Sequence, residues 1–389
     1  MRVSLITSFP PSPGDLNEYG YHLACAMRND PRVDLKILAD EAGPQQELSG
    51  FQVDRCWRFD SLLNPVRLFR AILKSKPDVV WFNIGFSTFA RAPVPAFLAL
   101  TVPAWARLMG YYTHITLHTV FERISLRDAG IRFPGLYRLA GRIATKLLLL
   151  SGDLSVLLPS FRSELLSNYG VNADRVWARP HGTFDGPQIS TVPRSGSSDN
   201  IVLAFGYWGT YKKIDLLLES IDQIRREAPN TVLVVAGTNH PSAPGYLESL
   251  RVKWAGHAGI RFLGYVPETD LHNLFRSATV LVLPYSSAAG TSGVVHQACQ
   301  YGLPMVGAAI PELVEIAQEE HIAIEFYEPG DGRALAHHLI RLLNTEELRR
   351  SFSQQNLLAA QGTPMQQVVG DYLRLFEQRA PASTMQVTG

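Results

Sequence analysis

The stretch that decides the fold is VLVLPYSSAAGTSGVVHQACQYGLPMV, residues 280–306. Its first four residues are apolar and end at a proline, which is typical of a buried parallel strand that gives way to a loop. Small residues form the loop, and a helical pattern runs from about residue 293 to residue 301. A Gly-Leu-Pro turn then opens another short apolar run at 304–306. The segment therefore predicts one strand–loop–helix–strand unit of a parallel α/β sheet.

The loop of this unit also suggests a ligand. The backbone N–H groups of Gly290, Thr291, Ser292 and Gly293 are expected at the positive N-terminus of the helix, with no bulky side chain in the way. That arrangement suits a phosphate group. The alternative is a plain strand–turn–helix connection in which a Ser or Thr caps the helix. The residues by themselves leave both interpretations open.

The same alternation runs along the whole chain. In the first half, strands are expected at 3–7, 35–38, 79–82, 115–118 and 154–158, with helices near 17–28, 64–75, 93–109 and 135–150. In the second half, strands are expected at 201–205, 232–236, 260–262, 280–283, 304–306 and 322–326, with helices near 212–226, 244–256, 268–275, 293–301 and 331–343. This pattern predicts an α/β fold with parallel sheets.

A break divides the chain into two domains. Residues 183–199 are rich in Ser, Pro and Gly and have no apolar period, so they are predicted to form a linker. The sequence thus predicts Rossmann-like domains at 1–182 and 200–363, and a last helix at 364–380 that crosses back to the first domain. Ligands of such sheets bind at the carboxyl ends of the strands, so a cleft between two facing sheets is the expected site.

Composition narrows the class of protein. The chain has 389 residues, of which 46% are hydrophobic and 18% charged, and this balance excludes disorder and a coiled coil. Its three cysteines are widely spaced and odd in number, which excludes a disulfide framework or a Cys-rich zinc module. The sequence predicts no metal site. A reducing, cytoplasmic setting is expected.

The 280–306 stretch resembles the donor-site signature of the retaining family 4 glycosyltransferases, which have the GT-B fold. In that family a strand ending in Pro leads to a Glu-Gly-Phe-Gly loop and to a helix with a second Glu eight residues after the first. The helix ends in a Gly-x-Pro-Val turn, which Gly302-Leu-Pro-Met-Val306 matches. Counting back from this turn places the two family carboxylates at Ala289 and Gln297. The resemblance implies donor contacts by Gly290–Val294 and hydrogen bonds from Gln297 to the nucleotide ribose.

A second match is FGYWGTYKKIDLLLE, residues 205–219. It is similar to the family's strand-end Gly-Arg followed by a Lys-Gly that opens a helix. Gly206 matches the glycine, Tyr207 replaces the arginine, and Lys212 falls on the lysine that neutralises the donor diphosphate. The alternative for Lys212 is a solvated charge at a helix end. Lys213 stands where the family has Gly and is expected to lend a second charge.

Two motifs of the first half agree with this resemblance. The Pro/Gly loop FPPSPGDLNEYG, residues 9–20, is similar to the family's first glycine loop over the sugar and diphosphate, with Gly14 and Asp15 as candidate donor contacts. Asp15 or Asn17 is equally suited to cap the following helix. His118 stands at the carboxyl end of the 115–118 strand, where the family has a His that touches the donor sugar. The alternative is a satisfied histidine at a strand end.

The resemblance implies a hexosyltransferase that moves a hexose from a nucleotide-diphosphate sugar to an acceptor hydroxyl, with retention of configuration. The acceptor is a glycan, a lipid-linked sugar or a small molecule. No metal or other cofactor is implied, because amides, a helix dipole and Lys212 stabilise the leaving diphosphate. Because both family carboxylates are missing, a catalytically silent protein that binds sugar nucleotides is the alternative.

Charge is distributed unevenly along the chain. Residues 1–190 carry 21 Lys and Arg against 16 Asp and Glu, a net charge of +5, while the whole chain is +1. No basic run is dense enough for nucleic acid. Arg138, Arg142 and Lys146 lie four residues apart in a leucine-rich helical pattern, which suits an anionic membrane surface. The alternative is that the leucines cover the first sheet and the charges are solvated.

Overall fold

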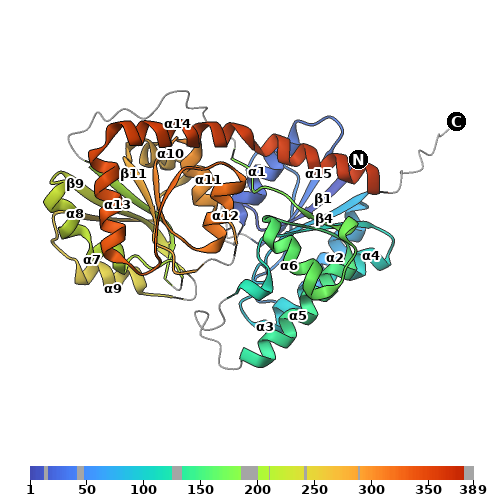
Figure 1. Cartoon of the computed structure of the whole chain (residues 1–389). Coiled ribbons are helices and arrows are strands. Elements are labelled where there is room, and N and C mark those ends of the chain that lie inside the picture. Colours follow the sequence, from blue (N-terminus) through green and yellow to red (C-terminus); the bar gives the residue numbers. More distant parts are fainter. Residues whose placement is uncertain are drawn as a thin grey trace. The chain divides into compact units, whose positions relative to one another are not determined.

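The computed structural model describes residues 1–12, 16–41, 48–124, 134–184, 200–209, 211–240, 243–287 and 290–380. The chain divides into two compact units. The first comprises Met1–Ile124, Phe133–His181 and Met365–Gly389, and the second comprises Ser125–Arg132 and Gly182–Pro364. Within each described unit a parallel sheet is covered by helices on both faces (Figure 1).

The first unit contains a seven-stranded sheet in the order β3-β2-β1-β4-β5-β6-β7, with every neighbouring pair parallel. Its strands are β1 (Arg2–Ile6), β2 (Asp34–Asp40), β3 (Val53–Trp57), β4 (Val79–Ile84), β5 (Tyr112–Leu117), β6 (Asp153–Val156) and β7 (Val176–Ala178). Its helices are α1 (Asn17–Arg28), α2 (Asn64–Ser75), α3 (Pro93–Ala99), α4 (Val102–Leu108), α5 (Pro134–Ser151), α6 (Pro159–Tyr169) and α15 (Met365–Arg379), with 3-10 turns at Phe121–Arg123 and Ala173–Arg175.

The second unit contains a six-stranded sheet in the order β10-β9-β8-β11-β12-β13, again parallel throughout. Its strands are β8 (Asn200–Trp208), β9 (Thr231–Asn239), β10 (Ile260–Gly264), β11 (Val280–Leu283), β12 (Met305–Ala308) and β13 (Ile324–Tyr327). Its helices are α7 (Asp215–Glu219), α8 (Ile221–Glu227), α9 (Tyr246–Lys253), α10 (Glu268–Ser277), α11 (Gly293–Gln300), α12 (Pro311–Glu319), α13 (Gly332–Asn344) and α14 (Glu346–Gly362).

The apolar runs of the sequence form the centres of both sheets. All six residues of β4 and all four of β11 and of β12 are buried, because helices cover both faces of these central strands. One short strand, β3, was absent from the predicted strands, whereas the Val-Trp-Ala run at 176–178 forms β7 as its sequence predicts. Strand β3 lies at an edge of the first sheet, where only one neighbouring strand pairs with it and the apolar pattern is weaker.

Proline breaks one expected helix. The pattern at 93–109 predicts a single helix, but α3 ends at Ala99 and α4 begins at Val102. Pro103 occupies the first turn of α4, where its missing N–H is not needed for a helical hydrogen bond. The expected helix at 212–226 is likewise two helices, α7 and α8, which meet at Ser220.

Helix α15 follows the second unit in sequence but belongs to the first. Its Tyr372 and Phe376 are fully buried and pack on Trp81 of β4, with ring centroids 4.7 Å and 5.2 Å away. The Tyr372 hydroxyl also lies 3.3 Å from Thr116 Oγ1 on β5. The helix therefore completes the core of the first unit. No helix within the described residues is long and apolar enough to cross a bilayer.

Candidate functional site

The order of the strands singles out one edge of the second sheet. The chain begins at β8, proceeds outward to β9 and β10, and returns to β11 on the other side of β8. The loops after β8 and β11 therefore leave the sheet in opposite directions and open a crevice at the carboxyl ends of these strands. Gly206 and Tyr207 lie near the end of β8 and Lys212 lies in the loop that follows it, while the described residues 284–287 and 290–292 lie between β11 and α11.

Lys212 was expected at a helix start, but it lies in a tight turn before the helix. Its backbone N–H donates to the carbonyl of Gly209 at 2.9 Å and its carbonyl accepts from the Gly209 N–H at 3.0 Å, so α7 begins only at Asp215. The side chain is half-buried, and Nζ lies 5.0 Å from the centre of the Tyr285 ring. Burial acts to lower the pKa of Lys212, but the phenol groups of Tyr285, Tyr211 and Tyr207 outweigh burial and raise it. The ammonium is therefore charged at neutral pH.

Two paired glycines lie at the ends of β8 and β9, the first of them beside this ammonium. A Cβ atom on Gly206 would lie 3.7 Å from Lys212 Nζ and 4.0 Å from Val294 Cγ2, which places all three residues at one point. Gly237, the neighbour of Gly206 on β9, has a φ of +111°, and a Cβ there would lie only 1.8 Å from the Gly206 carbonyl oxygen. The strand ends can approach this closely because Gly237 lacks a side chain.

The loop before α11 was the predicted anion cradle. Helix α11 begins at Gly293 as expected, and no side chain caps its first turn. The hydroxyl of Ser292 is 3.0 Å from that of Tyr285, which ties the loop to the residue beneath Lys212. The buried Thr291 Oγ1 has no hydrogen-bond partner in the described chain. The uncapped start of a helix, an unpaired hydroxyl and a nearby ammonium are groups that suit an anion.

Gln297 lies one turn into α11 from Val294 and is 6% exposed. The described part of the chain offers its amide no hydrogen-bond partner. Ala289, the other position that lacks a family carboxylate, lies outside the described residues. Tyr207 is 45% exposed beside the site, so it is accessible to a ligand.

A buried ion pair holds α11 from behind. His296 Nε2 is 3.0 Å from Glu320 at the end of α12, and both side chains are almost fully buried. Burial acts to lower the pKa of His296, but the Glu320 carboxylate raises it overall and is itself kept at a lowered pKa by His296. Glu320 therefore supports the helix, and does not stand in for a missing donor-site carboxylate.

His118 lies at the corresponding edge of the first sheet, directly after β5, as expected. Its Nε2 is 2.6 Å from Oδ1 of Asn83, whose Nδ2 donates to Thr7 Oγ1 at 2.9 Å. The Asn83 amide thus assigns the proton to Nε2 and leaves Nδ1 as an acceptor. Burial lowers the pKa of His118 to about 3. The rings of Tyr19 and His181 lie 4.5 Å and 6.5 Å from the His118 ring.

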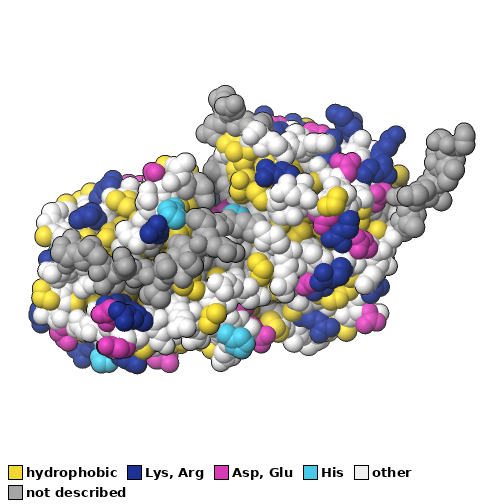
Figure 2. All heavy atoms as spheres, turned by 90° about the horizontal axis from the view of Figure 1, so that it is seen from above, with side chains coloured by type: hydrophobic (Ala, Val, Ile, Leu, Met, Phe, Trp, Pro, Cys, Tyr) yellow, Lys and Arg dark blue, Asp and Glu magenta, His cyan; other side chains and the backbone are white. Residues whose placement is uncertain are grey.

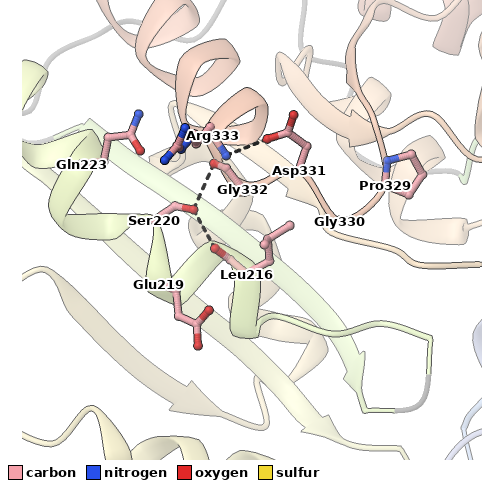
Figure 3. A pocket seen from close by; sticks show the side chains of 9 residues that line it. All are labelled: Leu216, Glu219, Ser220, Gln223, Pro329, Gly330, Asp331, Gly332 and Arg333. Atoms are coloured by element: carbon pink, nitrogen blue, oxygen red, sulfur yellow. Dashed lines mark hydrogen bonds between the residues drawn. The ribbon is translucent and has the colours of Figure 1, made fainter.

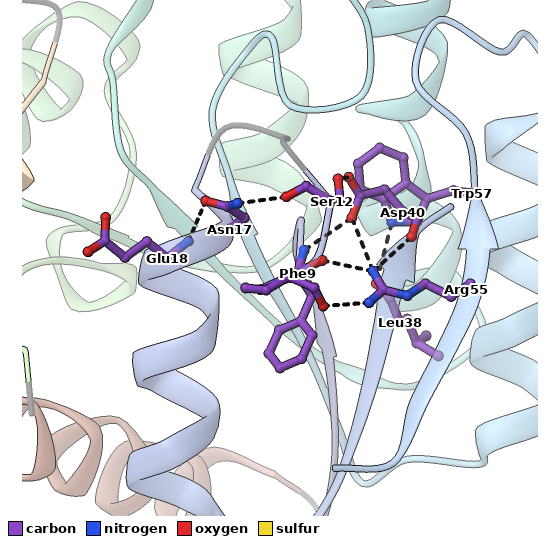
Figure 4. A network of polar contacts seen from close by, with 9 residues as sticks. Phe9, Ser12, Asn17, Glu18, Leu38, Asp40, Arg55 and Trp57 are labelled. Carbon is purple, nitrogen blue, oxygen red and sulfur yellow. Dashed lines mark hydrogen bonds and ion pairs between the residues drawn. The ribbon is translucent and has the colours of Figure 1, made fainter. Parts of the chain in front are cut away.

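Residues 9–12, the described start of the first loop, are held by a polar network that the sequence did not predict (Figure 4). Asp40 at the end of β2 accepts a hydrogen bond from the Phe9 N–H at 3.1 Å and another from the Ser12 hydroxyl. Arg55 of β3 donates to the carbonyls of Phe9 and Pro10 at 2.8 Å and 2.6 Å.

Asn17 continues this network at the start of α1. It is the first residue of the helix and not its cap, and its Nδ2 donates to the Ser12 carbonyl at 2.6 Å. The candidate donor contacts Gly14 and Asp15 lie outside the described residues.

A second depression in the second unit is lined by residues of α7, α8 and the 329–333 loop (Figure 3). Its polar groups bind one another: Ser220 Oγ donates to the carbonyls of Leu216 at 2.7 Å and Gly332 at 3.2 Å. Asp331 caps α13 through the N–H groups of Arg333 and Ala334. Because these groups are satisfied internally, the depression is a weaker candidate than the β8–β11 edge. The described residues contain no group of three or more His, Cys, Asp or Glu placed to hold a metal.

Comparison with known proteins agrees with this geometry. A family model described as "Glycosyl transferases group 1" matches residues 199–345, most of the second unit. The phosphatidyl-myo-inositol mannosyltransferase of Mycobacterium leprae is 25% identical over 210 residues, which cover 54% of this chain and 52% of that relative. The chain thus matches about half the length of this curated relative.

Two solved structures resemble nearly the whole chain. One is HepE of Anabaena in complex with UDP-glucose, with a TM-score of 0.72, 14% identity, and coverage of 97% of this chain and 100% of that one. The other is sucrose-phosphate synthase of Thermosynechococcus elongatus, with a TM-score of 0.75, 16% identity, and coverage of 97% and 98%. Together with the two parallel sheets, these likenesses show that the chain has the two-domain Rossmann-like GT-B fold.

Proposed function

We propose that this protein is a glycosyltransferase that moves a hexose from a nucleotide-diphosphate sugar to an acceptor hydroxyl, with retention of configuration. Residues of the β8–β11 edge bind the donor. Lys212 and the amides of residues 290–293 hold the diphosphate, and Gln297 hydrogen-bonds the ribose. The group 1 family match over residues 199–345 and the UDP-glucose complex of the Anabaena protein support a donor of this chemical class.

The observation that carries the proposal is the position of Lys212. Its ammonium lies 5.0 Å from the centre of the Tyr285 ring, and the Tyr285 hydroxyl contacts Ser292, the residue directly before the eight-residue helix α11. A fixed cation and free N–H groups stabilise the negative charge that develops on a departing diphosphate, and they need no rearrangement to do so. We therefore propose that the reaction requires no metal ion.

The first unit contributes a neutral imidazole. Asn83 holds the Nε2 proton of His118, so Nδ1 can accept a hydrogen bond from a sugar hydroxyl. The low pKa of His118 keeps this acceptor available throughout the neutral range. We keep His118 as the candidate sugar contact that the resemblance implies, with Asn83 and Thr7 as positioning residues.

Nucleotide release from a panel of UDP-, GDP- and ADP-sugars tests the proposal, with glycan and lipid-linked acceptors supplied in turn. We expect release from one donor that increases when a suitable acceptor is present and that persists in EDTA. The anomeric proton of the product, observed by NMR, reports retention or inversion. Lys212→Ala is the loss-of-function variant, and Lys213→Ala tests the expected second charge and should have the smaller effect, because Lys213 is exposed.

The outcomes separate the transferase from the silent alternative. A donor that binds in calorimetry without any release of nucleotide, with every acceptor, would favour a sugar-nucleotide-binding protein. An inverted product would refute the stereochemical part of the proposal and leave donor binding intact. Absence of binding by all three classes of nucleotide would refute the assignment of the site.

A further inference from the structure

One face of helix α5 is apolar and points into solvent. Leu136, Leu139, Ile143 and Leu150 recur at spacings of three, four and seven residues, so they share one face of the helix. Their side chains are 67%, 58%, 49% and 57% exposed. The residues that cover the first sheet are different ones, among them Ala144 and Leu148 on another face. The helix therefore has a second apolar stripe that the fold does not use.

Three cations lie along the same helix. Arg138, Arg142 and Lys146 are exposed and follow one another at a spacing of four residues, beside the apolar stripe. None of them forms an ion pair with a residue that the structure describes. Many other arginines of the first unit do, including Arg58 with Glu41 and Arg175 with Asp153. The charges of α5 thus remain available for an external partner.

The end of the neighbouring helix extends this surface. Helix α4 packs against α5, and at its C-terminal end Leu108 is 85% exposed and Met109 58%. The chain has no acidic residue at 79–121 or at 129–152, the two segments that contain α3, α4 and α5. By contrast, the face drawn in Figure 2 has Lys and Arg side chains interspersed with Asp and Glu. We define the α4–α5 surface as the apolar residues Leu108, Met109, Leu136, Leu139, Ile143 and Leu150 with the cations Arg138, Arg142 and Lys146. This surface combines exposed apolar area with positive charge alone.

We propose that the α4–α5 surface docks the protein on an anionic lipid bilayer. The leucines would enter the interface between headgroups and acyl chains, while Arg138, Arg142 and Lys146 contact lipid phosphates. A second copy of this chain is a poorer occupant. A symmetric dimer would place these cations against their own equivalents, with no carboxylate nearby to compensate. The inference does not depend on the proposed transfer activity.

Sedimentation with vesicles tests this docking on the full chain. The probes are vesicles of phosphatidylcholine alone and of phosphatidylcholine and phosphatidylglycerol in equal parts, each at low and high salt. We expect the protein to pellet with the anionic vesicles at low salt and to be released by salt. Arg138→Glu/Arg142→Glu/Lys146→Glu should weaken partitioning about hundredfold or more. Leu136→Ser/Leu139→Ser/Ile143→Ser should also reduce it, although the cations are kept.

The control reverses three exposed arginines of the second unit, Arg226→Glu/Arg261→Glu/Arg276→Glu, and so changes net charge equally. This variant should pellet like the wild type. If it loses binding as strongly as the α5 variant, net charge and not the α4–α5 surface is responsible, and the proposal is overturned. Failure of the wild type to pellet at low salt also overturns it. A third outcome would also overturn it: the wild type does not bind vesicles but dimerises with rising concentration, and the leucine variant does not dimerise. The occupant of the surface would then be a second copy of the chain.

Discussion

The carboxyl edges of the two sheets have the same topology and opposite chemistry. At the edge of the second sheet, Lys212 stays charged beside uncapped helix amides. At the edge of the first sheet, His118 is buried in a neutral form, bound to Asn83 and surrounded by aromatic rings. Burial disfavours the charged form of both side chains, but only Lys212 has phenol oxygens nearby that outweigh it. Side chains that are distant in the sequence but close in the fold thus decide which of the two groups, Lys212 or His118, stays protonated.

The largest expected effect is a difference between the two units in how their stability changes at acid pH. Burial lowers the pKa of His22, His114 and His118 in the first unit to about 4, 3 and 3. The unfolded chain therefore binds more protons below about pH 6.5, so stability falls as pH falls toward these values. At about pH 5 each histidine should cost roughly 2 kcal/mol. In the second unit the pKa of His296 is raised, so this group stabilises the fold in acid.

Hydrogen exchange measured peptide by peptide distinguishes the units. Between about pH 7 and pH 5, and after correction for intrinsic exchange rates, peptides of β5 should lose protection while those of β12 keep it. Equal loss in both strands would contradict the assignment of neutral histidines to the first unit. His118→Asn should reduce the pH dependence of β5, since asparagine does not titrate.

A single methyl group should disrupt the second edge. Gly237→Ala places a Cβ atom 1.8 Å from the Gly206 carbonyl oxygen at a φ of +111°. Strain and overpacking together should lower the free energy of unfolding by roughly 3 kcal/mol or more. Gly245→Ala is the control, because Gly245 also has a positive φ but open space around it, and should cost only about 1 kcal/mol. Similar denaturation midpoints for both variants would show that the strand ends can move apart.

Removal of the ammonium should affect binding more than stability. Lys212→Ala leaves a diphosphate without its charge-assisted hydrogen bond, a loss of roughly 1.5–3 kcal/mol or at least about tenfold in affinity. Calorimetry with UDP, GDP and ADP measures this loss, and Lys213→Ala should cost less than Lys212→Ala because Lys213 is exposed. An unaltered affinity in Lys212→Ala would place the diphosphate elsewhere.

The smallest effect is expected at Gln297. Gln297→Leu removes the hydrogen bonds to ribose and should weaken nucleotide binding by about 1 kcal/mol, whereas Gln297→Glu should bind as well as the wild type or better. Because Gln297 is buried and has no partner in the described chain, neither change should break an internal hydrogen bond. Equal affinity of all three proteins would show that Gln297 does not contact the nucleotide.

Local patterns in the sequence determined most elements of the fold and the place of the loop that we propose binds the donor. The apolar run at 280–283 forms β11 with those bounds, and the glycine at 293 begins α11, as predicted. Both follow from neighbouring residues: a continuous apolar run suits a strand covered on both faces, and small residues suit a helix start near a ligand. The place of His118 was predictable in the same way, because it directly follows the apolar run that forms β5.

Only the tertiary structure decided which side chains meet. Asn83 and His118 are 35 residues apart, His296 and Glu320 are 24 apart, and Asp40 reaches back 31 residues to the Phe9 amide. Strand order and helix packing, and not local pattern, bring these groups together, and burial and charged partners then fix the protonation of the two histidines. The same holds for α5. Its sequence contains enough leucines for two faces, and only packing showed which stripe covers the sheet and which is left exposed.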